Sequence, residues 1–227
     1  MPDHPSAYKA TWNHLAATEE SALMHVAGYT DPEKIKEATD ITLMWLRKCL
    51  GIHPMDTYLE IGCGVGRVGQ ALAPQVHRWI GCDVYEAMLG YAKNRLASHN
   101  NVDLVPINGF DLSPIPDASV DAVYCTVVFM HLQEWDRFNY VREAYRILKP
   151  GGRFFCDNAN LDSDIGWQVF MASAAIPPEE RPPHISRCST EPEIRTYLIR
   201  AGFQDVQTQF AGVWVMGWGV KSFPSFP

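Results

Sequence analysis

The chain has 227 residues, of which 47% are hydrophobic and 20% charged, and its formal net charge is -7. This length suits one well-buried α/β domain and is short for two. Nucleic-acid binding depends largely on clustered lysine and arginine, and because the sequence is acidic and contains no run of these residues, we expect no nucleic-acid partner.

The first 50 residues predict a helical cap. A helix is expected around residues 12–26, and apolar residues recur at helical spacing over residues 34–49. A second helix therefore precedes the first strand and ends at Gly51.

From residue 57 onward, short apolar runs alternate with segments of helical periodicity. Strands are expected at residues 57–61, 79–82, 102–107, 120–125, 153–157 and 206–210. Helices are expected through Val68 and Leu72 and at residues 85–98, 136–148 and 191–201. Such alternation is typical of a mostly parallel sheet covered on both faces, so the sequence predicts a doubly wound, Rossmann-like α/β fold.

The most informative stretch joins the first strand to its helix, where Gly62, Gly64 and Gly66 follow Glu60. A sharp strand-to-helix turn needs glycine where dihedral angles are unusual or where a ligand touches the main chain. Glycine spacing alone is a weak signal, because Gly64, Gly66 and Gly69 also fit the G-x-G-x-x-G pattern of dinucleotide-binding oxidoreductases.

Two acidic residues distinguish these alternatives. Glu60 stands two positions before the first glycine, where it would repel a pyrophosphate and attract a ligand with cationic groups. Asp83 closes the second strand, where a carboxylate can accept hydrogen bonds from both hydroxyls of a ribose. Capping of the following helix is the alternative role for Asp83. The pattern favours a cationic adenosine ligand over NAD or FAD.

At this point the sequence resembles the class I S-adenosylmethionine-dependent methyltransferases. The matching segments are Glu60–Arg67, Asp83 and residues 116–121 and 143–152, with a looser match at residues 197–203. Each segment is weak evidence alone, but together, in this order and spacing, they are specific. The resemblance implies S-adenosyl-L-methionine as cofactor and a seven-stranded sheet whose last strand, residues 213–220, is inserted antiparallel.

The resemblance also implies which residues contact the cofactor. Asp83 would hold the ribose and Val84 would lie beside the adenine. An acid that commonly reaches the adenine amine in this family is replaced by Gly109, and whether Phe110 or Asp111 substitutes for it is open. The expected cofactor-binding residues are Glu60, Gly62, Cys63, Gly64, Gly66, Arg67, Asp83, Val84, Met88, Gly109, Phe110, Asp111, Thr126, Val127 and Val128.

Methyl transfer requires mainly that the nucleophile and the methyl carbon are held in line, and a base only if the nucleophile is protonated and weakly acidic. Ligands in open α/β sheets bind beyond the carboxyl ends of the strands. His131, after the fourth strand, is the candidate base because of its pKa range, with a structural role as the alternative. A metal site at Asp157 and Asn158 is not expected, because Thr126 stands where a third acid would be needed.

An apolar pocket edge at residues 128–130 suits a small, partly apolar acceptor. Residues 158–190, which contain two Pro-Pro pairs, interrupt the sheet and are expected to form a lid. Aromatic residues at such positions often belong to the core instead. The expected substrate-binding residues are Tyr8, Trp12, Phe129, Met130, Asn158 and Trp167.

We therefore expect one methyltransferase domain over residues 1–227. Its parts would be an N-terminal helical cap (1–50), a cofactor-binding core (51–157), a lid insertion (158–190) and a C-terminal helix with strands (191–227). Methylation of oxygen or nitrogen in a small molecule is the expected activity, and a non-catalytic cofactor sensor or partner subunit is the alternative.

Compartment and assembly are predicted from simpler features. No signal peptide, transmembrane segment or C-x-x-C pair of cysteines is visible. A cytoplasmic protein without membrane contact is expected, either monomer or homodimer.

Overall fold

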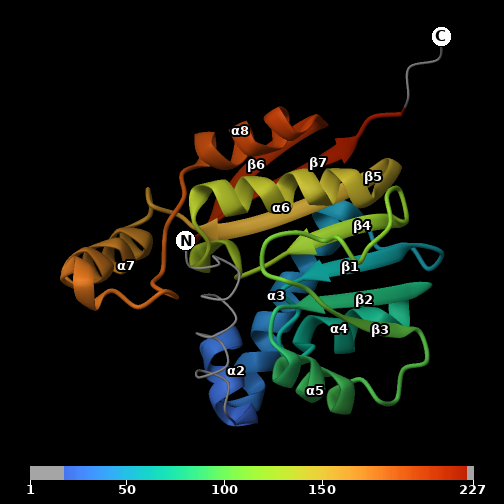
Figure 1. Ribbon diagram of the computed structural model, residues 1–227, viewed down its shortest axis with the longest axis horizontal. Coiled ribbons are helices and arrows are strands. Elements are labelled where there is room, and N and C mark those ends of the chain that lie inside the picture. Colours follow the sequence, from blue (N-terminus) through green and yellow to red (C-terminus); the bar gives the residue numbers. More distant parts are fainter. Residues whose placement is uncertain (1–17, 224–227) are drawn as a thin grey trace.

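The computed structural model describes residues 18–223, in which a seven-stranded sheet is flanked by helices (Figure 1). The strands are β1 (Thr57–Ile61), β2 (Arg78–Asp83), β3 (Val102–Pro106), β4 (Val120–Cys125), β5 (Leu148–Ala159), β6 (Phe203–Ala211) and β7 (Trp214–Lys221). The helices are α2 (Glu19–Ala27), α3 (Pro32–Leu50), α4 (Arg67–Leu72), α5 (Glu86–Arg95), α6 (Glu134–Ile147), α7 (Asp164–Ala174) and α8 (Glu191–Ala201), with short 3-10 turns η1 (Ala73–Gln75), η2 (Phe129–His131) and η3 (Pro178–Glu180).

The strand order is β3-β2-β1-β4-β5-β7-β6. The first five strands pair in parallel, whereas β7 runs antiparallel between β5 and β6. This confirms the predicted doubly wound sheet and its inserted last strand. Because β1 has β2 on one side and β4 on the other, its carboxyl end is the point where the order of the sheet reverses, and ligands of open α/β sheets bind at such points.

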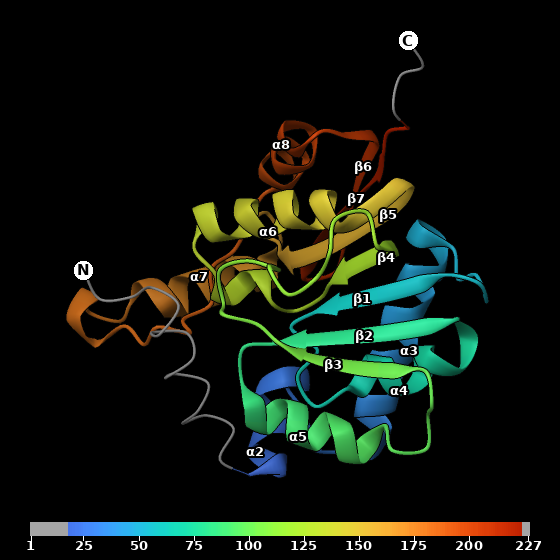
Figure 2. The same ribbon diagram turned by 45° about the vertical axis from the view of Figure 1, so that its right-hand side comes forward.

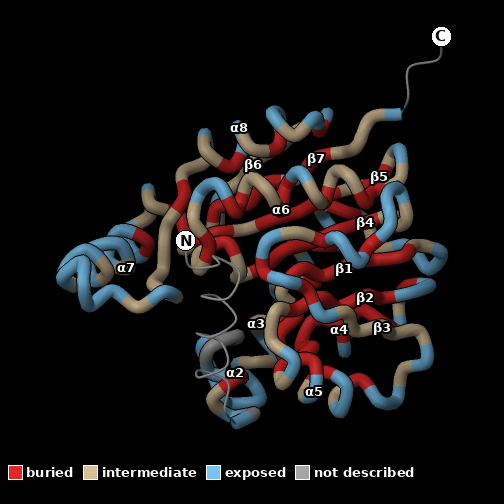
Figure 3. Tube along the Cα trace, viewed as in Figure 1, coloured by how far each residue is buried: buried red, intermediate tan, exposed pale blue. Residues whose placement is uncertain are grey.

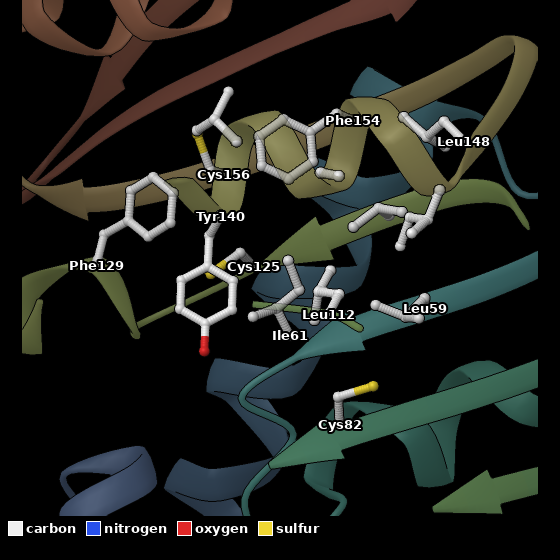
Figure 4. Packing of buried hydrophobic residues seen from close by; sticks show 14 of the residues in the cluster. Leu59, Ile61, Cys82, Leu112, Cys125, Phe129, Tyr140, Leu148, Phe154 and Cys156 are labelled. Atoms are coloured by element: carbon white, nitrogen blue, oxygen red, sulfur yellow. The ribbon is translucent and has the colours of Figure 1, made fainter. Parts of the chain in front are cut away.

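Helices cover both faces of the sheet (Figure 2), and the strands at its centre are buried (Figure 3). Side chains of these strands alternate between two apolar clusters, one on each face. On β1, Leu59 and Ile61 join the cluster packed under α6 and α8, part of which Figure 4 shows. Tyr58 joins the other cluster, under α3, α4 and α5. Since side chains two positions apart on a strand share a face, Glu60 enters the layer of α3 and α4. The pleat therefore puts a carboxylate beneath the glycine turn.

The insertion contains a helix that periodicity did not reveal. Within residues 158–190 the chain forms α7, whose N-cap is Ser163; the Ser163 side chain accepts a hydrogen bond from the amide of Gly166. The large apolar residues of α7 are exposed, so the helix does not bury them against the core. In Figure 1, α7 protrudes beyond the carboxyl edge of the sheet.

Two further predictions differ in detail. The helix expected around residues 12–26 is described from Glu19 onward as α2, and its earlier part lies outside the described residues. The fifth strand was expected at residues 153–157, but as β5 it already begins at Leu148. Gly151 takes a positive φ of 77° there, and the pairing of β4 with β5 shifts register between Val120 and Ala122.

Arg137 of α6 connects η2, the end of the insertion and α8 by hydrogen bonds. Its side chain is 1% exposed and donates hydrogen bonds to the carbonyl of Phe129 (2.9 Å), the hydroxyl of Ser189 (2.9 Å) and the carboxylate of Glu193 (3.0 Å). It also reaches the carbonyl of Arg187 at 3.1 Å. A buried guanidinium is tolerated when its donors are satisfied in this way. The bonds hold η2 and the end of the insertion together.

Between residues 18 and 223, no helix is both long enough and apolar enough to cross a bilayer.

Candidate functional site

A pocket opens at the carboxyl end of the sheet, at the point where the strand order reverses. It is concave and partly open to solvent, as small-molecule sites are. Its lining residues are Ile61, Gly62, Gly64, Asp83, Val84, Met88, Ile107, Gly109, Thr126, Val127, Val128, His131, Leu132 and Tyr140.

The amides of the glycine turn are already used inside the protein. The N–H groups of Gly62 and Cys63 donate to the carbonyl of Cys82 at 2.8 and 2.9 Å, and the N–H of Gly64 donates to a carboxylate oxygen of Asp83 at 2.8 Å. A dinucleotide needs amides of this turn for its pyrophosphate. The turn therefore suits a ligand without phosphate, an argument that the sequence offered only through the charge of Glu60.

Two glycines of the turn are required by close packing. At Gly62, with φ of 71°, an added Cβ would lie 2.3 Å from Cγ2 of Val128. At Gly66, with φ of 74°, a Cβ would lie 2.9 Å from Leu96 at the end of α5. Gly62 thus belongs to the floor of the pocket, whereas Gly66 allows α5 to approach the turn.

Asp83 links the glycine turn to the residue before α5. Its carboxylate accepts hydrogen bonds from the amides of Gly64 at 2.8 Å and Tyr85, the residue before α5, at 3.0 Å. Burial raises the pKa of Asp83 to about 6, and the hydrogen bonds from the amides of Tyr85, Gly64 and Val84 counteract that rise. Each carboxylate oxygen can accept a second hydrogen bond, and Asp83 lines the pocket. Its side chain caps no amide within α5, but it can hold the residue before that helix and still accept hydrogen bonds from ligand hydroxyls.

Glu60 lies beneath the turn and outside the pocket lining. It accepts a hydrogen bond from the hydroxyl of Tyr124 at 2.8 Å, and that hydroxyl accepts one from the indole N–H of Trp79 at 2.9 Å. Burial raises the pKa of Glu60 to about 8, with the hydroxyl of Tyr124 and the charge of Arg67 acting in the opposite direction. Without a further cation nearby, the charged form of Glu60 is costly.

Arg67 is the buried cation of this region. It is 7% exposed, and one terminal nitrogen donates to the hydroxyl of Thr39 at 3.0 Å, whereas Nε has no partner among the residues that the structure describes. Burial lowers its pKa, and the charges of Glu60, Tyr124 and Asp157 oppose that change. Arg67 thus faces two carboxylates, so a bound cation would improve the charge balance. The residues fit a cationic adenosine ligand.

The chain leaves β4 through an unusual conformation. Val127 has φ of 61°, a left-handed conformation that costs a β-branched residue about 1–3 kcal/mol. Its amide donates to Oδ1 of Asp157 at 2.7 Å, and a hydrogen bond to a charged group contributes about 1.5–3 kcal/mol. The bond is strong enough to offset the strain. Burial raises the pKa of Asp157 to about 7, with the amide of Val127 and the charge of Arg67 lowering it.

His131 lies on the wall of the pocket in η2. Its Nδ1 is 3.0 Å from the carbonyl oxygen of His184 in the insertion. Because a carbonyl can only accept, Nδ1 carries the hydrogen, and in the neutral ring Nε2 is then the acceptor nitrogen. This tautomer is the one that a general base acting through Nε2 requires.

The structure brings many of the predicted residues into one pocket, namely Gly62, Gly64, Asp83, Val84, Met88, Gly109, Thr126, Val127, Val128 and His131. Cys63 is buried at the turn. After β3, the side chains of Phe110 and Asp111 do not line the pocket: Phe110 is 46% exposed, and Asp111 accepts hydrogen bonds from Asn108 and Ser113.

The residues expected to bind the acceptor are more dispersed. Phe129 is fully buried in the core, and the main-chain carbonyl of Met130 accepts a hydrogen bond from Arg187 at 2.8 Å. Asn158 is fully buried and donates to the hydroxyl of Ser189 at 2.7 Å. Trp167 is half exposed on α7 and stacks on Phe170 with ring centroids 5.3 Å apart. Tyr8 and Trp12 lie outside the described residues.

Sequence reasoning missed Ile61, Ile107, Leu132 and Tyr140 in the lining. Tyr140 of α6 is 2% exposed, and its hydroxyl has no hydrogen-bond partner in the described part of the chain. In Figure 4 its ring lies beside Cys125 and its hydroxyl points away from Phe154. In the sequence Tyr140 is one apolar position of a helix face, so only the packing of α6 against the sheet reveals its place in the pocket.

Residues 59–156 match the family described as methyltransferase domain. A probable S-adenosylmethionine-dependent methyltransferase of Mycolicibacterium smegmatis is 39% identical over 102 residues, which cover 45% of this chain and 37% of that protein. The demethylmenaquinone methyltransferase of Listeria welshimeri is 33% identical over 132 residues, covering 55% of this chain and 54% of that one. The chain thus spans about half, or less, of the length of these relatives.

Among solved structures, a methyltransferase of Thermotoga maritima, described as a possible histamine N-methyltransferase, has a TM-score of 0.68 with 21% identity. The match covers 94% of this chain and 99% of that one. At this identity the likeness concerns the fold, which agrees with the sheet order described above. The sequence match thus supports a methyltransferase domain over residues 59–156, and the likeness to the solved structure supports the fold.

Proposed function

We propose that this protein transfers a methyl group from S-adenosylmethionine to an oxygen or nitrogen atom of a small, partly apolar molecule. The observation that carries the proposal is the glycine turn, whose amides are engaged with Cys82 and Asp83 while buried carboxylates surround it. The engaged amides cannot bind a phosphate, and the buried carboxylates repel a phosphate and attract a cationic nucleoside.

The cofactor supplies an electrophilic methyl group on a sulfonium, and the chain's residues supply its binding and orientation. Asp83 would accept hydrogen bonds from the ribose hydroxyls, and Val84, Met88 and Ile107 would pack against the base. Glu60 and Asp157, facing Arg67, would favour the positive charges electrostatically. Holding the reactants in line is the main contribution that a protein makes to such a reaction, up to about 7–11 kcal/mol of the barrier.

The wall formed by Val127, Val128 and Leu132 supports an acceptor with an apolar body. His131, with Nε2 as its acceptor nitrogen, would remove a proton from a hydroxyl acceptor. Several relatives are named for demethylmenaquinone, a molecule with an apolar body, which makes it one acceptor to test. Because a quinone carries no hydroxyl or amine, a labelled product from it would mean methylation of carbon, whereas a product from an alcohol, phenol or amine would support transfer to oxygen or nitrogen.

The direct test is transfer of label from S-adenosylmethionine carrying a radioactive methyl group. Purified protein is incubated with demethylmenaquinone or with a metabolite extract, and labelled products are separated. We expect labelled product that depends on the acceptor. A protein that binds NAD or FAD at this pocket, and shows no affinity for S-adenosylmethionine at millimolar concentration, would refute the proposal.

Asp83→Ala should weaken binding of S-adenosylmethionine by about 2–4 kcal/mol, since two charge-assisted hydrogen bonds would be lost. Isothermal titration calorimetry measures the change. Asp83→Asn keeps one acceptor oxygen and should lose less. Asp103→Ala is the matched control, because Asp103 is exposed on β3 and pairs with Arg78 at the surface, an interaction worth about 0–1 kcal/mol. Unchanged affinity in folded Asp83→Ala would remove Asp83 from the binding site.

Cofactor binding should weaken as the pH falls. Asp83 and Asp157 have pKa values raised to about 6 and about 7 by burial, and a cationic ligand binds better to their ionised forms. Between pH 7.5 and pH 5.5 the affinity should therefore drop roughly tenfold or more.

The same shifts predict the pH dependence of stability. Because these folded-state pKa values lie above the ordinary ones, the stabilisation from the protonated carboxyls is present at low pH and is lost as the pH rises through about 6 to 7. The increase in melting temperature caused by S-adenosylmethionine should accordingly grow from pH 5.5 to pH 7.5. S-adenosylhomocysteine, which lacks the sulfonium charge, should show a smaller trend. A ligand effect that is constant or shrinks with rising pH would contradict the assignment.

His131→Asn tests the base. The asparagine amide can replace the Nδ1–H donor toward the carbonyl of His184, but it offers nothing in place of Nε2. With a hydroxyl acceptor, kcat should fall by about 10²–10⁴-fold, while the dissociation constant for S-adenosylmethionine stays within about threefold of wild type. Steady-state kinetics and calorimetry separate the two quantities. An unchanged kcat would assign His131 a structural role only.

A further inference from the structure

Val127, which follows the end of β4, has a strained main-chain conformation and lines the ligand pocket. Three non-glycine residues of the described chain have positive φ, namely Ala118, Val127 and Asp205. Val127 is the one of these three that lines the pocket. A β-branched side chain adopts this conformation rarely, and strain of this kind persists only where the surroundings impose it.

The conformation of Val127 determines how the next residue meets the glycine turn. Val128 follows it and packs on Gly62 so closely that a Cβ at Gly62 would lie 2.3 Å from Cγ2 of Val128. Thr126, Val127 and Val128 all line the pocket. If the main chain at Val127 relaxed to a negative φ, Val128 would leave Gly62 and the floor of the pocket would change shape.

The group that holds this conformation lies on the neighbouring strand. The pairing of β4 with β5 ends at Cys125 and Cys156, so Asp157 is the first residue of β5 beyond that ladder. Its Oδ1 accepts the amide hydrogen of Val127 at 2.7 Å and thereby continues the pairing by a side chain. Asp157 and this hydrogen bond are partly buried, so water has only limited access to the carboxylate.

We infer that Asp157 is a positioning residue, whose carboxylate holds Val127 in its left-handed conformation and so shapes the floor of the ligand pocket. Its role is exerted through Val127 and Val128 and needs no contact with the ligand. The ligand-dependent part of this inference rests on the proposed function, whereas the clamp itself can be tested without ligand.

The experiment compares the wild type with Asp157→Asn, Asp157→Leu, Val127→Gly and the double variant Val127→Gly/Asp157→Leu. Asparagine retains an oxygen acceptor for the amide but no charge, and leucine retains neither. Glycine at position 127 adopts positive φ without penalty, so the clamp is dispensable in that background. The single variant Val127→Gly measures separately how much affinity is lost with the valine side chain.

The first readout is hydrogen exchange of the Val127 amide by NMR in the ligand-free protein. Exchange should be slow in the wild type and in Asp157→Asn, and at least roughly tenfold faster in Asp157→Leu. Equal exchange rates in all three would overturn the inference. If Asp157→Leu fails to fold, Asp157→Ala takes its place, with melting temperature as the check.

The second readout is the dissociation constant for S-adenosylmethionine. Asp157→Leu should raise it roughly tenfold or more when Val127 is present, but threefold or less in the Val127→Gly background. Asp157→Asn, which loses the charge but keeps the acceptor oxygen, should lose clearly less affinity than Asp157→Leu. Equal losses in Asp157→Asn and Asp157→Leu, without rescue by Val127→Gly, would mean that Asp157 acts by its charge alone and would overturn the inference. Absence of binding in the wild type would instead refute the proposed function and leave the exchange result standing.

Discussion

The site depends on one hydrogen bond, from the amide of Gly64 to the carboxylate of Asp83. It joins the turn after β1 to the tip of β2, and through the amide of Tyr85 the same carboxylate fixes the start of α5. The bond also removes from the ligand site an amide that a phosphate would need. A single buried acid therefore defines the shape of the turn and restricts the chemistry of the ligand.

The arrangement leaves the ligand-free protein with unfavourable electrostatics. Glu60 and Asp83 are buried and Asp157 is partly buried near the carboxyl ends of β1, β2 and β5, and Arg67 is the cation that acts on Glu60 and Asp157. Hydrogen bonds satisfy these carboxylates only in part, so their pKa values rise. Such unfavourable electrostatic energy can persist at a functional site because binding of a ligand of the opposite charge compensates for it.

Much of this could be predicted from the sequence. Local periodicity predicted the strands and helices. Glu60, the glycines and Asp83 predicted the glycine turn, because these residues are close in sequence and a strand-to-helix turn constrains the backbone geometry. The roles of Asp157 and Tyr140 could not be predicted in the same way. Asp157 acts on Val127 through a register between two strands, and Tyr140 reaches the pocket through the packing of a helix on the sheet. Such pairings are set by tertiary structure and leave no mark in local periodicity.

The insertion illustrates a further limit of sequence reasoning. Its aromatic residues suggested a lid whose side chains touch the acceptor, yet Trp167 and Phe170 stack on each other on an exposed helix. The described part of the insertion reaches the pocket wall through its main chain instead. The carbonyl of His184 holds the ring of His131, and the amide of Arg187 donates to the carbonyl of Met130.

Arg137 of α6 also holds this segment, with hydrogen bonds to Phe129 in η2 and to Ser189 near the end of the insertion. Because these contacts mostly involve the main chain, the insertion can orient His131 whatever side chains α7 carries. The position of the candidate base is thus fixed by the fold, whereas the exposed surface of α7 is free to vary without disturbing it.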